Sequence, residues 1–329
     1  MNGIQVEHLT KTYRGALTPA LADVSLSVAP GEVCGVIGPN GAGKTTLIGC
    51  LLGFLFPDAG RIRLDGLPPD DRAVRRVTGY LPERLVMDRW MSGADFLAYH
   101  HGLAGLPAAG RAADVSRALE QVGLAGEAAR RSVGRYSRGM LQRIGLAQAL
   151  LGEPRYLFLD EPTSGMDPSG VVLFRRLIDE ASRRGTTVLL NSHQLAQVEK
   201  VCTRVVFVKG GRVEAMETID VGATHVRDLH IRVMSGAPEE AVERALRVPL
   251  PPGSRFERRN GNELVYLVPS DEAAATLLRE LIGAGLPVVE AVPGEGRLER
   301  LFDESAGRRA AEAARATSPG VTPGAGGAA

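Results

Sequence analysis

Residues 38–45, the phosphate loop, combine glycines, a lysine and a hydroxyl side chain at a spacing suited to binding phosphate. They fit the pattern G-x-x-x-x-G-K-[ST], in which glycines let successive backbone N–H groups turn toward one anion. We expect Lys44 to reach the terminal phosphates of a nucleotide and the Thr45 hydroxyl to hold Mg²⁺. The residues predicted to bind the nucleotide here are Gly38, Pro39, Asn40, Gly41, Ala42, Gly43, Lys44, Thr45 and Thr46.

Two acids, Asp160 and Glu161, follow an apolar run at residues 156–159. Carboxylates that end an otherwise buried strand are costly unless a cation faces them. Asp160 is therefore expected to hold Mg²⁺, usually through water, and Glu161 to orient or deprotonate an attacking water. The plainer interpretation of this pair is an ordinary solvated turn.

The elements that must position these residues can be predicted from hydrophobic patterning. Short apolar runs alternate with helical stretches from Ile4 to about Thr218, which is the pattern of a parallel α/β sheet. The first buried strand is expected to end directly before the phosphate loop, and a helix to begin near Lys44. This order predicts an α/β fold with a P-loop NTPase core. The strands predicted to be buried on both faces are Val33–Ile37, Tyr156–Leu159, Val188–Leu190 and Val205–Val208.

The sequence pattern changes at residues 88–151, which contain helix-forming segments rich in Ala and Arg and no convincing strand. They predict a helical subdomain inserted in the α/β core. Gly210 and Gly211, between two β-rich runs, predict a tight hairpin turn. We place the whole nucleotide-binding domain at residues 1–220.

Residues 225–304 are predicted to form a small α+β domain. The expected order of elements is βαββαβ, which is that of a ferredoxin-like unit. Residues 305–329 are too poor in large apolar side chains to bury a core and are expected to be disordered. The predicted strands are Leu229–Val233, one near Arg255–Arg258, Glu263–Val268 and Pro287–Val292, and the predicted helices are Pro238–Arg247 and Glu272–Ala284, the second capped by Asp271.

The composition excludes several classes of protein. The 329 residues are 44% hydrophobic and 23% charged, as in a globular chain, and the net charge of +1 provides no field to recruit nucleic acid. Three distant cysteines indicate neither a disulfide framework nor a zinc site. The N-terminus lacks the features of a signal peptide, and the longest apolar stretch, Leu47–Phe56, is well short of the roughly 20 residues of a spanning helix.

Further motifs before, between and after these sites point to a family. Residues 136–143 (YSRGMLQR) resemble the signature motif of ATP-binding-cassette (ABC) ATPases, and residues 164–167 (SGMD) resemble its D-loop. His193 matches the switch histidine, Tyr13 the adenine-stacking aromatic, and Glu83 stands in the Q-loop. Found together in this order, the motifs make the N-terminal domain similar to the ATP-binding subunit of an ABC transporter.

The resemblance implies an ATPase in which two chains sandwich ATP and Mg²⁺, with Glu161 and His193 as catalytic residues. Ser137, Gly139 and Asp167 of one chain are implied to contact the nucleotide bound by the other. The implied partners are a second ATP-binding subunit, in the simplest case a copy of this chain, and integral membrane permease subunits. The implied location is peripheral, at the cytoplasmic face of the cell membrane.

The chain departs from the family's usual form in two places. The signature reads YSRGM where LSGGQ is usual, and Glu83, implied to help hold Mg²⁺, stands where glutamine is usual. These variants and the extra C-terminal domain resemble the drug- and sodium-exporter branch, which favours export.

Two other functions stay open: an ABC-type ATPase that remodels a macromolecular complex, and a non-catalytic binding module. Trp90 and Met91 either line a groove for a membrane partner or pack within the helical subdomain.

Overall fold

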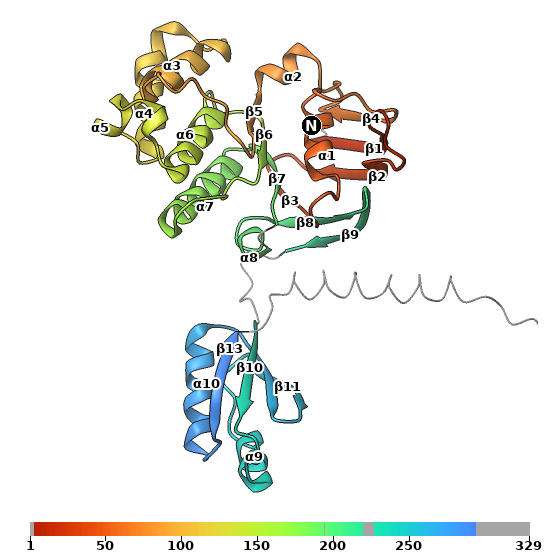
Figure 1. The fold of residues 1–329 in the computed structure, drawn as a ribbon, viewed down its shortest axis with the longest axis vertical. Coiled ribbons are helices and arrows are strands. Elements are labelled where there is room, and N and C mark those ends of the chain that lie inside the picture. The colour runs from red at the N-terminus through yellow and green to blue at the C-terminus, as the bar shows by residue number, and fades with distance from the viewer. Residues whose placement is uncertain (1–2, 194, 220–226, 294–329) are drawn as a thin grey trace, which may run out of the picture. The chain divides into compact units, whose positions relative to one another are not determined.

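The computed structural model describes residues 3–193, 195–219 and 227–293 of the chain. The chain divides into two compact units, Met1–Val221 and Gly222–Ala329, and each is described by itself (Figure 1). The predicted disorder of residues 305–329 lies outside the described residues.

A six-stranded sheet forms the centre of the N-terminal unit. Its strands lie in the order β5-β6-β7-β3-β8-β9, in which β5 to β8 pair in parallel and β9 is antiparallel to β8. Every residue of β3, β6 and β7 is buried, as expected for strands covered on both faces. The predicted parallel α/β core is confirmed. The strands are β5 (Thr78–Leu81), β6 (Tyr156–Asp160), β7 (Thr187–Asn191), β3 (Val33–Ile37), β8 (Arg204–Lys209) and β9 (Arg212–Thr218).

The first strands of the chain belong to a separate antiparallel sheet, in the order β2-β1-β4, so the predicted parallel pattern from Ile4 was wrong for them. β2 alternates between buried and exposed residues, as in a sheet with one face in solvent. The link between β1 and β2 also lacks the helix that a parallel crossover needs. The bounds are β1 (Ile4–Lys11), β2 (Leu21–Val28) and β4 (Ala59–Leu64).

Helices surround the core and form the inserted subdomain. α1 (Lys44–Leu51) begins directly after the phosphate loop, and α7 (Pro168–Arg183) follows β6. Between residues 88 and 151, all of which the structure describes, there are helices and no strand, as predicted. The subdomain helices are α3 (Gly93–Leu103), α4 (Arg111–Gln121), α5 (Glu127–Arg130) and α6 (Arg138–Leu150), and the remaining helices of this unit are α2 (Arg72–Arg76) and α8 (Leu195–Val198).

The predicted hairpin turn joins β8 to β9. Lys209 pairs with Arg212, which leaves Gly210 and Gly211 as a two-residue loop. Both glycines have positive φ, at +54° and +75°, which is the requirement of a type I′ turn.

The C-terminal unit has the predicted βαββαβ order and a four-stranded antiparallel sheet, β11-β12-β10-β13, which is the ferredoxin-like arrangement. Its second helix begins one residue earlier than predicted. The side chain of Ser270, rather than that of Asp271, accepts the free N–H of Ala273 at 3.1 Å. The elements are β10 (Arg227–Val233), α9 (Glu239–Leu246), β11 (Arg255–Asn260), β12 (Glu263–Val268), α10 (Asp271–Gly283) and β13 (Val288–Pro293).

Candidate functional site

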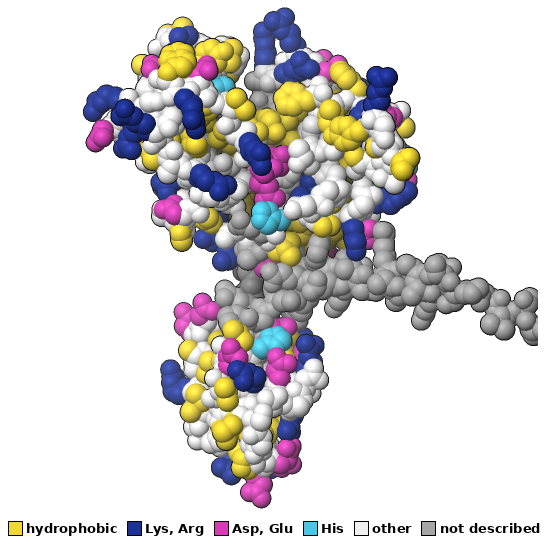
Figure 2. Space-filling model, in the orientation of Figure 1, with side chains coloured by type: hydrophobic (Ala, Val, Ile, Leu, Met, Phe, Trp, Pro, Cys, Tyr) yellow, Lys and Arg dark blue, Asp and Glu magenta, His cyan; other side chains and the backbone are white. Residues whose placement is uncertain are grey.

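A pocket of about 530 Å³ lies in the N-terminal unit where the phosphate loop meets the ends of β6 and β7. Ligands of open α/β sheets bind at the carboxyl ends of the strands, which is where this pocket lies. Acidic and histidine side chains gather near the centre of this unit on the face drawn in Figure 2. The lining residues are Tyr13, Ala20, Asn40, Gly41, Ala42, Gly43, Lys44, Thr45, Thr46, Glu83, Asp160, Glu161, Ser164, Asn191 and His193.

The phosphate loop depends on glycine at two positions. A Cβ on Gly43, whose φ is +104°, would lie 2.3 Å from the carbonyl oxygen of Ala20. A Cβ on Gly38 would lie 2.0 Å from the carbonyl oxygen of Val208. The loop is therefore packed against neighbouring backbone and keeps a shape that a larger residue would disturb.

Lys44 lies inside the phosphate loop. Its ammonium donates hydrogen bonds to the carbonyl oxygens of Gly38 at 2.7 Å and Pro39 at 3.0 Å, and the residue is 7% exposed. Burial lowers the pKa of Lys44, while the carboxylates of Glu161 and Asp160 oppose this shift. The site thus holds a largely desolvated cation where the phosphates of a nucleotide would sit.

Asp160 ends β6 and is 2% exposed. Burial raises its pKa, the polar side chains of Asn191 and Thr45 oppose this, and the charge of Glu83 raises it further. Among the described residues, Oδ1 of Asp160 has no hydrogen-bond partner. A buried carboxylate with an unused oxygen, close to a second acid and a hydroxyl, fits a hard divalent cation.

Few protein side chains in this pocket are available to bind a metal ion. The described residues contain no group of three or more His, Cys, Asp or Glu side chains arranged to hold a metal. Mg²⁺ is commonly held by one or two carboxylates together with the phosphates of the substrate. Thr45, Glu83 and Asp160 therefore suit a metal that arrives with a nucleotide.

Glu161 and His193 meet at the edge of the pocket, with Oε2 of Glu161 2.9 Å from Nδ1 of His193. The backbone of Glu161 is left-handed, with φ +48°, which is a strained conformation for a residue with a Cβ. Its N–H donates to Oδ1 of Asn191 at 2.8 Å, so the end of β7 holds this conformation in place. The carboxylate is thereby presented to the pocket beside Asp160.

Tyr13 lies in the same pocket, far from these residues in sequence. Its hydroxyl hydrogen-bonds the hydroxyl of Thr46 at 3.1 Å, and the residue is 46% exposed. The ring is thus tied to the first turn of α1 while much of its surface stays available for stacking.

Ser137, Gly139 and Asp167 do not line this pocket. Ser137 caps α6, where its hydroxyl accepts the N–H of Met140 at 3.2 Å, and Asp167 caps α7. A Cβ on Gly139 would lie 3.5 Å from the carbonyl oxygen of Gly165, so the signature motif packs against the D-loop. Gly38 and Pro39, at the start of the phosphate loop, are also absent from the lining, and the other predicted residues lie together in the pocket.

Sequence reasoning missed Asn191, Ala20 and Ser164 as lining residues. Asn191 was detectable, because it is a polar residue that ends a buried strand beside β6, which is the signal that identified Asp160. Ala20 carries no such signal, since it contributes a position in a loop rather than a chemical group.

Residues 21–164 match the family described as ABC transporter. The "Uncharacterized ABC transporter ATP-binding protein YxlF" of Bacillus subtilis (strain 168) is 36% identical over 290 residues, which cover 87% of this chain and 93% of that protein. The "Daunorubicin resistance ATP-binding protein DrrA3" of Streptomyces coeruleorubidus is 40% identical over 203 residues, which cover 61% of this chain and 64% of that protein.

Solved structures resemble the N-terminal part of the fold. One described as the ATP binding subunit of an ABC transporter has a TM-score of 0.61 at 30% identity and covers 66% of this chain and 90% of its own. The dimeric structure of the cassette MJ0796 has a TM-score of 0.61 at 23% identity, covering 66% and 99%, and shows the fold alone. In the described part of the chain, no helix combines the length and apolar character needed to cross a bilayer.

Proposed function

The chain belongs to the ABC transporter ATP-binding proteins, and from that premise we propose that it is the motor subunit of an exporter. Members of this family bind and hydrolyse ATP. One observation carries the assignment of the catalytic centre: Lys44, Asp160 and Glu161 line one pocket, and the Glu161 carboxylate is 2.9 Å from the His193 ring.

Each pocket residue has a distinct proposed role in hydrolysis. Lys44 and the N–H groups of the phosphate loop hold the β- and γ-phosphates, and the Tyr13 ring stacks on the adenine. Glu161 accepts a proton from the attacking water, and His193 orients its carboxylate.

Thr45, Glu83 and Asp160 are the residues proposed to hold Mg²⁺. When bound there, Mg²⁺ would neutralise part of the negative charge of the phosphates. The unused Oδ1 of Asp160 and the neighbouring charge of Glu83 support this assignment.

We assign Ser137, Gly139 and Asp167 to a site completed by two subunits. They lie outside the lining of the pocket, and Ser137 caps α6, whose first N–H groups suit a phosphate. In this arrangement the signature motif of one copy meets the γ-phosphate bound to the other. The cassette MJ0796, which shares this fold, is dimeric, and this supports the assignment by analogy.

The proposed membrane partner is a permease that docks on apolar side chains near Glu83. Phe54 and Val86 are exposed, and Phe54 contacts Tyr80 at 6.0 Å between ring centroids. Trp90 is 77% exposed, which supports the docking interpretation over internal packing. The likeness to a daunorubicin resistance protein supports export, and a permease partner places the chain at the cytoplasmic face of the membrane.

Sedimentation of the Glu161→Gln variant with and without Mg²⁺-ATP tests this proposal. Removal of the base while the binding site is kept should trap an ATP-dependent dimer. Glu127→Gln, an exposed change on α5, is the matched control and should not accumulate a dimer. A Glu161→Gln monomer that binds ATP would contradict the two-copy site, and one that binds no ATP would contradict the pocket assignment.

A further inference from the structure

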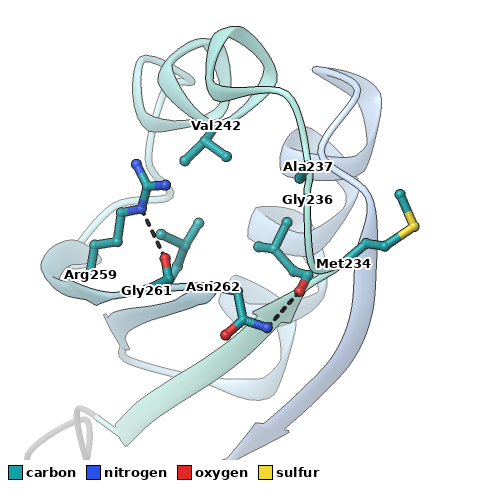
Figure 3. A pocket seen from close by; sticks show the side chains of 9 residues that line it. Met234, Gly236, Ala237, Val242, Arg259, Gly261 and Asn262 are labelled. Atoms are coloured by element: carbon teal, nitrogen blue, oxygen red, sulfur yellow. Dashed lines mark hydrogen bonds between the residues drawn. The ribbon is translucent and has the colours of Figure 1, made fainter.

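The C-terminal unit contains a cavity of about 260 Å³, which is unrelated to the nucleotide pocket (Figure 3). Three segments enclose it: the turn after β10, the helix α9, and the hairpin that joins β11 to β12. Figure 3 shows α9 covering one side and Arg259 reaching toward it from β11.

The floor of the cavity is apolar. Val233, Val242 and Leu264 line it, and each is almost completely buried within the core of this unit. A hydrocarbon group would be removed from water there, which is favourable in proportion to the area covered. The volume is close to the lower end, about 300 Å³, of the usual range for small-molecule pockets, so the cavity suits a small organic molecule.

The rim carries one charge, because Arg259 is the one charged side chain among the described residues that line the cavity. Its guanidinium donates to both carboxylate oxygens of Glu239, at 2.9 Å for Nη2 to Oε2, and its Nε donates to the carbonyl oxygen of Gly261 at 3.1 Å. The structure thus already shows this guanidinium binding a carboxylate beside an apolar cavity.

The bond from Arg259 to Glu239 is one that another carboxylate can replace. The two side chains are 34% and 64% exposed, so water and salt screen their attraction and a carboxylate from solution has access to the guanidinium. Glu239 also lies in the first turn of α9, where the helix dipole stabilises its charge when the arginine is engaged elsewhere.

Asn262 adds a polar contact on the opposite side of the cavity. Its Nδ2 donates to the carbonyl oxygen of Val233 at 3.1 Å, which fixes the orientation of the amide (Figure 3). This amide donor is used within the unit, and Arg259 is the charged donor among the described residues that line the cavity.

We propose that this cavity binds a small branched aliphatic carboxylate. The hydrocarbon packs on Val233, Val242 and Leu264, and the carboxylate takes the place of Glu239 on Arg259. The class follows from one cation at the rim, no acid in the lining, an apolar floor and a small volume.

The test is a ligand-observed NMR titration of the full chain with 4-methylpentanoate, which has eight heavy atoms. Its neutral analogue, 4-methylpentanamide, has the same size and lacks the charge. We expect saturable binding of the acid and at least tenfold weaker binding of the amide, since Arg259 pairs with a carboxylate and not with an amide.

Three variants locate the binding. Arg259→Gln should weaken binding of the acid at least tenfold, whereas Arg255→Gln, on the same strand and outside the lining, should leave it unchanged. Glu239→Gln should strengthen binding several-fold, because it removes the competing carboxylate. Absence of saturable binding, equal affinity for acid and amide, or unchanged affinity in Arg259→Gln would overturn the proposal.

Discussion

The two units of this protein bury different kinds of residue. In the N-terminal unit, Lys44, Asp160 and Asn191 lie buried around the pocket, and Glu161 keeps a left-handed backbone. Among the described residues of the C-terminal unit, Asp228 is the one charged or polar residue that is buried, and the core otherwise consists of aliphatic side chains and Tyr266.

The difference indicates which buried residues serve a chemical function and which serve the stability of the fold. A desolvated lysine and a carboxylate with an unused oxygen lower stability, so they persist where a ligand compensates for them. The ion pairs that arginine forms in the described part of the C-terminal unit, such as that of Arg232 with Glu290, lie at the surface. Substitutions in the pocket of the N-terminal unit should therefore mainly lower activity, whereas substitutions in the core of the C-terminal unit should mainly lower stability.

The largest expected effect separates two glutamates that both contact a histidine. Glu161 lies 2.9 Å from His193, and Glu263 lies 2.7 Å from His230 in the C-terminal unit. Glu161→Gln should lower kcat for phosphate release about 10²- to 10⁴-fold, since it removes the proposed general base. Glu263→Gln should leave kcat unchanged, and an equal loss in both variants would break the comparison.

The next effect concerns the cores. Leu277 on α10 is fully buried in the C-terminal unit, and Leu277→Ala should lower the unfolding free energy by about 2–5 kcal/mol. The ATPase rate should stay the same at temperatures where this unit is folded. Leu157→Ala in β6, the strand that ends at Asp160, should lower both the unfolding free energy and the ATPase rate. Urea unfolding and ATPase assays on the same preparations distinguish the two outcomes.

A smaller effect concerns the pH dependence of stability. The pKa of Asp160 is raised by burial, so the folded protein binds this proton more tightly than the unfolded chain does. The unfolding free energy should therefore fall as pH rises from the ordinary value of 3.8 through the raised value. Asp160→Asn should remove this fall and add about 1 kcal/mol of stability at pH 7.

Urea titrations at several pH values in Mg²⁺-free buffer measure that change. Asp179→Asn, an exposed change on α7, should keep the pH dependence of the parent protein. If Asp160→Asn showed the same slope as the parent, burial of this carboxylate would not limit the stability of the N-terminal unit.

The smallest effect compares two helix caps of the same chemistry. Ser137 accepts the N–H of Met140 at 3.2 Å, and Ser270 accepts the N–H of Ala273 at 3.1 Å. Replacement of either serine by alanine should cost about 1 kcal/mol of stability. Only Ser137→Ala should also slow ATP hydrolysis, because that hydroxyl is assigned to the nucleotide of a second copy. An unchanged rate would argue for a purely structural Ser137.

Much of this architecture could be predicted from local patterns. β3, β6 and β7 are uninterrupted apolar runs, and the phosphate loop directly follows one of them, so their positions were apparent. The antiparallel pairing of β1 and β2 was not, because periodicity reports which residues are buried but not which strand lies alongside. Ser270 and Asp271 are adjacent capping residues, and the sequence does not distinguish which of them the backbone uses.

The candidate site shows the same limit. Lys44 and Thr45 are placed by one contiguous motif, whereas Tyr13 reaches the pocket through a contact with Thr46 that no local pattern predicts. Asn191 acts through Glu161, which directly follows β6, and so depends on the pairing of β6 with β7. Residues whose role requires a neighbouring strand are the ones that sequence reasoning alone tends to miss.

The left-handed backbone of Glu161 matters to anyone who evolves this protein in the laboratory. A φ of +48° costs a residue with a Cβ about 1–3 kcal/mol, whereas glycine adopts it freely. A library selected for yield or heat resistance will therefore accumulate glycine at position 161, giving robust proteins that hydrolyse nothing. Selection must reward turnover in every round, because one of the described positions where glycine would relieve such a backbone is the proposed catalytic carboxylate.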